Sequence, residues 1–483
     1  KVTGVQTCAL PIYRIEKDLL GQRQVPAEAY YGIETLRGKE NFEITKRGIC
    51  RQMIKALAIV KKAAAKANVD ALNIDEKVGK AIMLACDEIL NGRLHGQFVT
   101  DLIQGGAGTS MNMNANEVIA NRANELLGGK KGVYDFVHPN DHVNFGQSTN
   151  DVIQTAGKIA IVKQLKKLQV ELKKLYNAYL NKATEFKDVI KMGRTHLQEA
   201  LPLRLGQEFS AYASALNRDM KRIDVAIEAL LEVNMGATAI GTSLNANEKY
   251  RKKVIYYLNK FSGEQIKPAK DLIDATRNFD TFGQASSTLK LLALNLSKTA
   301  SDLRLMASSG SNGFSEITLP HVQPGSSIMP GKYNPVVPEM VNQVCFYVIG
   351  LDVTITKAIE AGQLELNVFG PIILMSLFEQ ITTLRRATRT FHNLAISGLI
   401  ANTTKYKTDN SIYLITALSP HLGHEEACNV VNEAISSEKT IKQVLLDHHI
   451  LSEEIINMVL DESNMTNPGI ALENILKEKK EQE

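Results

Sequence analysis

The sequence predicts a mainly α-helical protein of three domains, with a bundle of long helices at its centre. Apolar residues recur at three- and four-residue steps over long segments, as on one face of a helix, and the alternation typical of strands is scarce. Of the 483 residues, 44% are apolar and 22% are charged, which is an ordinary globular composition and excludes a disordered or collagen-like chain.

The predicted long helices cover four segments: 158–186, 207–233, 284–306 and 339 to about 366. The first contains neither glycine nor proline, and it follows Ser148-Thr149-Asn150-Asp151, whose side-chain oxygens suit the start of a helix. A helix of about 25 residues is roughly 40 Å long, which exceeds the usual length in globular proteins. We therefore expect these helices to pack side by side in a bundle.

Shorter helical patterns lie on either side of these segments. Before residue 150 they occur at 51–68 and 75–91, between turns rich in glycine, asparagine and proline, and after about residue 399 the pattern shortens again. We predict three domains: a mostly helical N-terminal domain at 1–149, in which 1–12 are an unassigned extension, a central helical bundle at 150–404, and a small C-terminal helical domain at 405–483.

Charge and cysteine usage narrow the possible partners and compartment. The 56 basic and 52 acidic residues nearly cancel, which does not suggest a nucleic-acid or membrane partner. The five cysteines are scattered and never form a CxxC pair, which argues against zinc sites and disulfides and fits the cytoplasm. The first twelve residues do not resemble a signal peptide, and no run of eighteen apolar residues predicts a membrane span.

Four polar segments interrupt the helical pattern: 105–114, 146–151, 193–198 and 325–335. In the first three, glycine precedes hydroxyl or amide side chains just before a predicted helix. The start of a helix combines backbone N–H groups with the positive end of the helix dipole, so it favours anions such as carboxylates. Each segment alone could simply cap a helix, but the four together favour an anion site.

The fourth polar segment differs from a nucleotide-binding P-loop. Five residues separate Gly325 from Gly331, and Tyr333 follows Lys332, whereas a P-loop has four residues between its glycines and a Ser or Thr after its Lys. We expect a flexible loop whose two glycines act as hinges for closure over a ligand.

Two further patterns bear on the site. His138 and His142 are four residues apart, as in a helical metal pair, but Pro139 disfavours a helix there and we expect no metal site. The segment 362–367 places polar side chains late in the last long helix, where they could form a buried network that supports a site.

The fourth polar segment resembles the signature GSSxMPxKxNP of the fumarase/aspartase superfamily and matches it at every fixed position. The resemblance extends from about Tyr13 to Leu472 and includes the segments 193–198 and 362–367. Pro338 before Glu339, together with Arg204, resembles the aspartases of this superfamily more than its class II fumarases. Gly146 and Tyr333 depart from the usual Ser and Val.

The resemblance implies a reversible elimination of ammonia from L-aspartate, which gives fumarate through an aci-carboxylate intermediate. The alternative is a class II fumarase or another fumarate-releasing lyase of the superfamily. A third reading, a non-catalytic protein like the superfamily's lens crystallins, is disfavoured because the candidate functional residues are retained. The elimination needs no cofactor; some aspartases are activated by Mg²⁺, but no cluster of ligands in this sequence requires the ion.

The resemblance also implies roles for individual residues. Ser326 would be the catalytic base, and His196 is the rival because the pKa of histidine lies closer to neutrality. A serine oxyanion needs stabilisation by loop N–H groups, a helix dipole or Lys332. The substrate-binding residues would be Thr109, Ser148, Thr149 and Ser327 for the β-carboxylate, Lys332, Asn334 and the nearby Thr195 for the α-carboxylate, and Asn150 with His196 for the amine.

Members of the superfamily are homotetramers in which four bundles form a common core and each active site uses three subunits. The polar segments lie at the ends of long, rigid helices, and one bundle does not readily bring them all to one point. We therefore expect the segments 148–150, 195–196 and 326–334 to come from different chains of a homotetramer that binds a small dicarboxylate.

Overall fold

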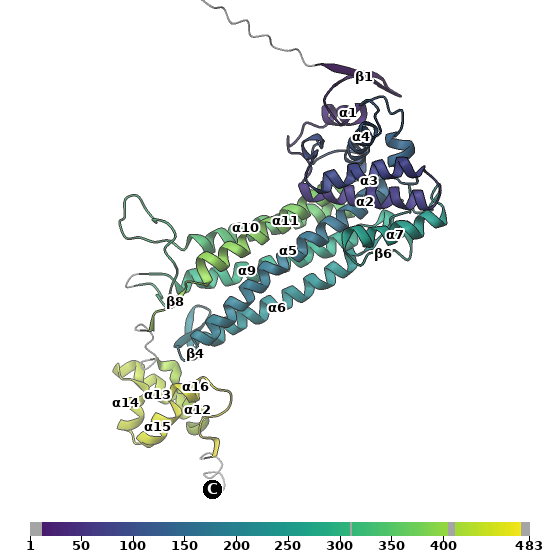
Figure 1. The fold of residues 1–483 in the computed structure, drawn as a ribbon. Helices are drawn as coiled ribbons and strands as arrows, with labels where there is room; N and C mark the ends of the chain where they lie inside the picture. The colour runs from purple at the N-terminus through teal and green to yellow at the C-terminus, as the bar shows by residue number, and fades with distance from the viewer. Residues whose placement is uncertain (1–11, 310–311, 404–410, 475–483) are drawn as a thin grey trace, which may run out of the picture. The chain divides into compact units, whose positions relative to one another are not determined.

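The computed structural model describes residues 12–309, 312–403 and 411–474, and it is a helical bundle with short pairs of strands (Figure 1). The prediction of a mainly α-helical fold is confirmed. The chain divides into two compact units. The first consists of the residues up to Val170, Asp219–Ala293 and Val344–Arg385, and the second of Glu171–Arg218, Leu294–Gln343 and the residues from Arg386 onwards.

Five long helices contribute residues to both units: α5 (Thr149–Glu185), α6 (Leu205–Leu230), α9 (Asp280–Met306), α10 (Val336–Glu360) and α11 (Gly370–Phe391). The first four correspond to the four predicted long helices. The fifth, α11, was not predicted, although its buried Ile373, Leu377 and Ile381 follow the same helical spacing.

Helix α10 ends at Glu360, earlier than predicted, because its last carbonyl groups are capped by a side chain. The Asn367 amide donates to the carbonyl oxygens of Ala358 and Ile359 at 2.9 and 3.1 Å. The segment 362–367 is therefore a tight turn after the helix, and the prediction that it lies within the helix was wrong. Asn367 is buried, whereas Gln363 and Glu365 are exposed, so only Asn367 points inward as expected.

The first unit also contains shorter helices and strands. They are β1 (Tyr13–Asp18), β2 (Gly21–Pro26), α1 (Ile33–Asn41), α2 (Arg51–Asp70), α3 (Glu76–Leu90), η1 (His95–Gln97), η2 (Gly106–Gly108), α4 (Thr109–Leu126), η3 (Pro139–Val143), β5 (Glu232–Val233), α7 (Glu248–Ser262), β6 (Lys267–Pro268) and α8 (Leu272–Arg277). Helix α2 packs against both α3 and α7 (Figure 1). Its buried face carries many alanines, whose small side chains allow close packing.

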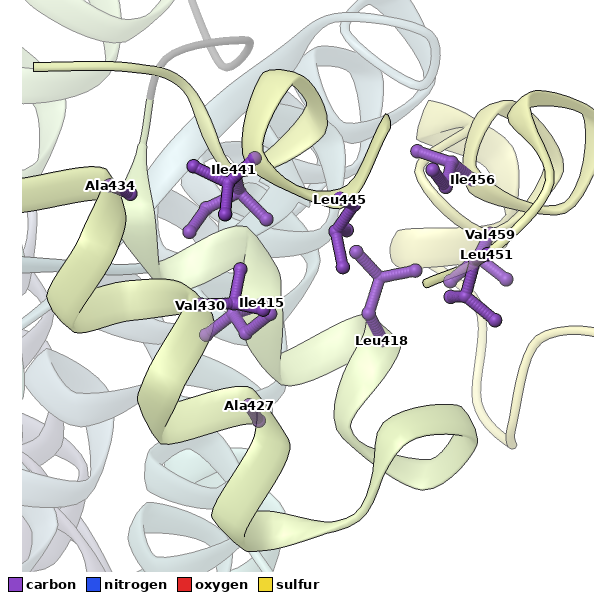
Figure 2. Packing of buried hydrophobic residues seen from close by; sticks show 11 residues of the cluster. Ile415, Leu418, Ala427, Val430, Ala434, Ile441, Leu445, Leu451, Ile456 and Val459 are labelled. Carbon is purple, nitrogen blue, oxygen red and sulfur yellow. The ribbon is translucent and has the colours of Figure 1, made fainter. Parts of the chain in front are cut away.

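The smaller elements of the second unit are two strand pairs and a group of short helices. They are β3 (Ile190–Thr195), β4 (Gln198–Arg204), β7 (Ile317–Thr318), η4 (His392–Ile396), β8 (Ile400–Ala401), η6 (Ile412–Leu414), α12 (Ile415–Leu422), α13 (His424–Ser437), α14 (Ile441–Asp447), α15 (Glu453–Val459) and α16 (Glu462–Met465). Helices α12 to α15 share one apolar core, in which Leu418, Leu445 and Ile456 are fully buried (Figure 2).

The predicted division into three domains stays a prediction. Its boundary at 149–150 coincides with the start of α5, whereas its boundary at 404–405 and residues 1–11 of the unassigned extension lie outside the described residues. Helix α10 is long and apolar enough to cross a membrane by length and composition alone, but core helices of soluble proteins pass the same test. Only 39% of its most apolar stretch is buried within this chain, so much of that apolar surface faces outward.

Candidate active site

The first two polar segments meet at one open hollow of the first unit, with a volume of about 940 Å³. Thr109 at the start of α4 and Ser148 and Thr149 at the start of α5 line it. The prediction that these segments lie at helix starts is confirmed. Asn150 follows, and its amide nitrogen donates to the carbonyl oxygen of Ala239 at 2.6 Å, which leaves its side-chain oxygen to accept a donor such as an amine.

The start of α4 depends on a left-handed turn. Gly106, Ala107 and Gly108 have φ angles of 77°, 59° and 95°. The two glycines adopt such angles without strain, whereas the alanine adopts them at a cost in free energy. A Cβ on Gly108 would lie only 3.2 Å from the side chain of Ile153. The hydroxyl of the exposed Thr109 donates to the carbonyl oxygen of Gly106 at 2.7 Å, so the turn also holds this side chain at the rim.

The start of α5 is held by the buried carboxylate of Asp151. Its two oxygens accept backbone N–H groups from Ser148 at 2.9 Å and from Gly236 and Thr238 at 3.1 Å. Burial raises the pKa of Asp151 to about 6, although these three N–H groups oppose the rise. The contact joins the segment 236–238 to the first turn of α5 and thereby sets one wall of the hollow.

Five amide side chains outside the predicted site residues also line this hollow. Three of them, Asn112, Asn144 and Gln147, lie in α4 or just before α5. Asn112 and Gln147 belong to the first two polar segments, where they were read only as polar composition. Asn144 lies outside the segments, and its position three residues before Gln147, on a turn after η3, is a signal that could have found it.

The signature loop, residues 325–335, is closed on itself in the second unit. The backbone N–H of Gly325 donates to the carbonyl oxygen of Lys332 at 3.0 Å, and the amide of Asn334 donates to the carbonyl oxygen of Gly325 at 2.9 Å. A Cβ on Gly325 would collide with the Lys332 carbonyl, so the closure requires glycine. Gly331 has a φ of 81°, a left-handed conformation that favours glycine. Its expected use as a hinge stays a prediction.

Ser326 lies inside this loop, and its hydroxyl oxygen has two backbone donors. It accepts backbone N–H groups from Ile328 at 3.3 Å and from Met329 at 3.2 Å. Hydrogen bonds to the charged form of a group favour that form, so these donors favour a Ser326 oxyanion. Ser327 is exposed on the same loop.

Lys332 and Asn334 line a separate hollow of about 350 Å³ in the second unit. Tyr333, the residue that departs from the usual valine, also lines it and stacks on His321 with ring centroids 3.6 Å apart. The lysine head is exposed and therefore available to a negatively charged ligand.

Thr195 and His196 stand at the tip of the β3–β4 hairpin, both exposed. His196 and Leu197 have φ angles of 54° and 62°, a left-handed pair that hairpin turns usually build from asparagine and glycine. The prediction that the third polar segment precedes a helix was wrong, because its chain reverses into β4. Residues held in this conformation cost free energy and cluster at functional sites.

Buried charges anchor the base of this hairpin. The Lys191 ammonium lies 2.7 Å from the Glu316 carboxylate, and Arg194 pairs with the other oxygen of the same carboxylate. Glu316 immediately precedes β7 and the chain that leads into the signature loop, so the ion pairs connect the hairpin to that chain.

The turn around His138 differs from the prediction. Pro139 begins the short π-helical element η3 instead of preventing a helix, because proline fits a first helical position that needs no N–H partner. The Nδ1 atoms of His138 and His142 both accept backbone N–H groups. Among residues 12–309, 312–403 and 411–474, no group of three or more His, Cys, Asp or Glu side chains is placed to hold a metal ion.

The ten predicted site residues thus fall into three groups, each within one unit. One group borders the hollow at the starts of α4 and α5, the second belongs to the signature loop, and the third is the hairpin tip. Each group offers donors to a carboxylate or a site for proton transfer. The roles of the individual residues remain predictions.

Comparisons with known proteins identify the fold and a common chemistry. A family model described as "Lyase" matches residues 21–350, and one described as "Fumarase C C-terminus" matches residues 414–467. The chain is 51% identical to the aspartate ammonia-lyase of Bacillus subtilis (strain 168), over 96% of this chain and 98% of that protein.

Two solved structures share the fold over 95% of this chain and 100% of their own. One is a fumarate lyase:delta crystallin from Brucella melitensis bound to cobalt, with 44% identity and a TM-score of 0.92. The other is a class II fumarase from Schistosoma mansoni, with 34% identity and a TM-score of 0.92.

Asp151→Asn is expected to lower the free energy of unfolding, because an amide replaces one accepting oxygen with a donor. Between the ordinary pKa of 3.8 and the folded value of about 6, the folded protein holds a proton that the unfolded chain has lost. The stability contributed by Asp151 therefore falls as pH rises through this window, and the asparagine variant lacks that fall. The free energy of unfolding of the wild type and of Asp151→Asn is measured with urea at about pH 4 and about pH 7. The difference in this free energy should be smaller at pH 7.

Asp271→Asn is the matched control, because it makes the same chemical change at an exposed residue that caps α8. If the difference in the free energy of unfolding between the wild type and Asp151→Asn instead grows as pH rises, the burial of a carboxylate at the start of α5 is contradicted.

Proposed function

This chain belongs to the fumarase/aspartase family of lyases, and we propose that it converts L-aspartate reversibly into fumarate and ammonia. It is a carbon–nitrogen lyase. The substrate assignment is supported by 51% identity to an aspartate ammonia-lyase over nearly the full length, against 34% to a class II fumarase. The alternative substrate, L-malate, would use the same donors with a different leaving group.

The chemical difficulty of this reaction is the charge that it creates. Removing a proton from the carbon next to the β-carboxylate places a second negative charge on that group, which becomes an aci-carboxylate. The electron pair then forms the double bond of fumarate while the carbon–nitrogen bond breaks and ammonia leaves. Preorganised donors stabilise such a charge, and removal of one typically costs about 3 kcal/mol.

The observation that carries the proposal is the environment of Ser326. Two backbone N–H groups point at its hydroxyl oxygen, and Lys332 lies on the same loop. These donors support the assignment of a Ser326 oxyanion as the base that takes the proton from the substrate carbon. His196 remains the rival base, and its exposed position on a strained hairpin tip suits contact with a ligand.

The three groups of residues are assigned to different parts of the substrate. We assign the β-carboxylate to hydroxyl groups at the two helix starts and to Ser327, and the α-carboxylate to Lys332, Asn334 and Thr195. Asn150 and His196 would orient the amine, and the free side-chain oxygen of Asn150 supports its part. An elimination of this kind changes no net oxidation state, so we propose that it proceeds without a cofactor.

We further propose that four chains assemble and that each active site takes its three groups from three chains. The exposed apolar side chains of α10 support an interface: Phe346 is 62% exposed and Val353 is 59% exposed. Such a surface is costly in water and is typical of subunit contacts. The scattered cysteines and the nature of the substrate favour the cytoplasm as the compartment.

The purified protein should release fumarate and ammonia from L-aspartate and form L-aspartate from fumarate with excess ammonia. The assay follows the absorbance of fumarate, with L-malate and argininosuccinate as the competing substrates. If fumarate forms faster from L-malate than from L-aspartate, the protein is a fumarase and the assignment is wrong.

Ser326→Ala should lower kcat by about 10²- to 10⁴-fold, the usual contribution of a general base, while a competitive dicarboxylate still binds. Lys332→Ala should instead weaken dicarboxylate binding by about ten- to a hundredfold, because a charged hydrogen bond is lost. Near-normal turnover in Ser326→Ala would remove this serine as the base and favour His196.

Ser326→Ala and His196→Ala should each be nearly inactive and should regain activity when refolded together. If the two side chains reach one site from different chains, about a quarter of the sites in a random one-to-one mixture carry neither substitution. Each variant refolded alone is the control. Hybrid tetramers that stay as inactive as these controls would contradict the shared site.

A further inference from the structure

Lys61 is a fully buried lysine of α2 that lies behind the first hollow without lining it. Its ammonium nitrogen donates to the side-chain oxygens of Asn144 at 2.8 Å and of Gln147 at 3.0 Å. Both of these amides do line the hollow. The lysine therefore reaches the wall of the candidate active site from inside the protein.

The direction of these hydrogen bonds decides how the two amides are turned. A lysine has donors and no acceptor when it is charged, so both amides must present their oxygens to Lys61. Their nitrogens then face the other way. Gln147 donates to the carbonyl oxygen of Val143 at 3.0 Å, and Asn144 donates to the carbonyl oxygen of Gln147 at 3.3 Å. By holding the two amide oxygens, Lys61 directs the two amide nitrogens to backbone carbonyl oxygens of the turn before α5.

The chain of hydrogen bonds continues from Asn144 through Asn112 to Thr149. The Asn144 oxygen that faces Lys61 also accepts from the amide nitrogen of Asn112 at 3.2 Å. That nitrogen lies 3.4 Å from the hydroxyl oxygen of Thr149 and donates to it weakly. Because an incoming donor uses a lone pair of this oxygen, the Thr149 hydrogen is left free to donate to a ligand in the hollow.

We propose that Lys61 is a positioning residue that acts through Asn144 and Asn112 to keep the hydroxyl of Thr149 turned outward as a donor. The proposal rests on the proposed function, in which Thr149 binds a carboxylate of the substrate. Lys61 itself touches neither substrate nor reacting atoms. Its role is to remove the freedom of two amides to rotate. A rotated Asn112 would present its oxygen to Thr149 and accept the hydroxyl hydrogen, which would leave Thr149 only lone pairs for the ligand.

The charge of the lysine affects how firmly the relay is held. Burial lowers the pKa of Lys61 to about 7, and the carboxylate of Asp151 and the thiol of Cys86 oppose that fall. The neutral amine retains two N–H donors, which is the number that Asn144 and Gln147 require. The neutral amine also carries a lone pair that an amide N–H can use, so the orientation of the two amides is fixed most firmly by the charged form.

The test measures succinate binding to the intact enzyme by calorimetry in four proteins: wild type, Lys61→Met, Thr149→Val and the double variant. Methionine matches the length and apolar stem of lysine but donates no hydrogen bond. We expect Lys61→Met to weaken binding about tenfold, the effect of one lost donor. The double variant should bind within about twofold of Thr149→Val alone, because residues that act through one contact are not additive.

Lys158→Met is the matched control. Lys158 is also buried in the first unit, but its ammonium donates to the backbone carbonyl of Glu232. This variant should bind succinate as the wild type does. If folded Lys61→Met also binds succinate like the wild type, the proposal is overturned. It is also overturned if the losses of succinate affinity in the two single variants multiply in the double variant.

If Lys61→Met does not fold, Asn144→Leu tests the next member of the relay. It should weaken succinate binding and show no added loss in the Thr149→Val background; wild-type affinity or multiplied losses would overturn the proposal. Binding is measured without turnover, so a wild type that binds succinate but leaves L-aspartate unchanged refutes only the proposed reaction.

Discussion

Asp151 takes three backbone N–H groups from Ser148, Gly236 and Thr238, and this buried contact sets where the first residues of α5 lie. A helix start supplies N–H donors and a favourable dipole, but these help a ligand only when the surrounding backbone does not move. Asp151 restrains the backbone, and Lys61 restrains the amides beside it. The hydroxyl groups of the hollow therefore act from a rigid frame.

The signature loop, in contrast to the helix start, carries its donors on a segment that we expect to move. In the proposed reaction Ser326 acts as the base and its oxygen needs donors, whereas we expect the loop that carries it to close over a substrate. The hydrogen bonds among Gly325, Lys332 and Asn334 close the loop locally and leave its outer residues exposed. The donors to Ser326 come from the loop itself, so they would move with the serine when the loop moves. A base held in this way depends little on the distance between the loop and the rest of its own chain, which suits a site completed by other chains.

Much of the fold was predictable because helix periodicity is a local property. Helices α2 and α3 begin and end within two residues of the predicted bounds, and the four long helices were found from the spacing of apolar residues. The turn after α10 was missed because the side chain of Asn367, which satisfies the helix end, follows it in a segment read as helix. The β3–β4 hairpin was missed because His196 and Leu197 occupy a turn that normally favours asparagine and glycine.

The candidate site was predictable only in part, since its supporting residues are recognisable only in three dimensions. Lys61 belongs to a run with Lys62 and Lys66, and such a run is typical of an exposed helix face. Contacts with Asn144 and Gln147, more than 80 positions away, explain why Lys61 alone of the three is fully buried. The signature around Ser326 identified the family from sequence, whereas the N–H donors to its oxygen became visible only in the structure.

The most direct test of the whole account is a crystal structure of the Ser326→Ala enzyme with L-aspartate bound. We predict that one carboxylate of the substrate lies against Ser148 and Thr149 of one protomer. The other carboxylate should lie against Lys332 and Asn334 of a second protomer, with the substrate carbon facing residue 326. A substrate held by Thr149 and Lys332 of the same chain, or one bound away from the signature loop, would contradict this prediction.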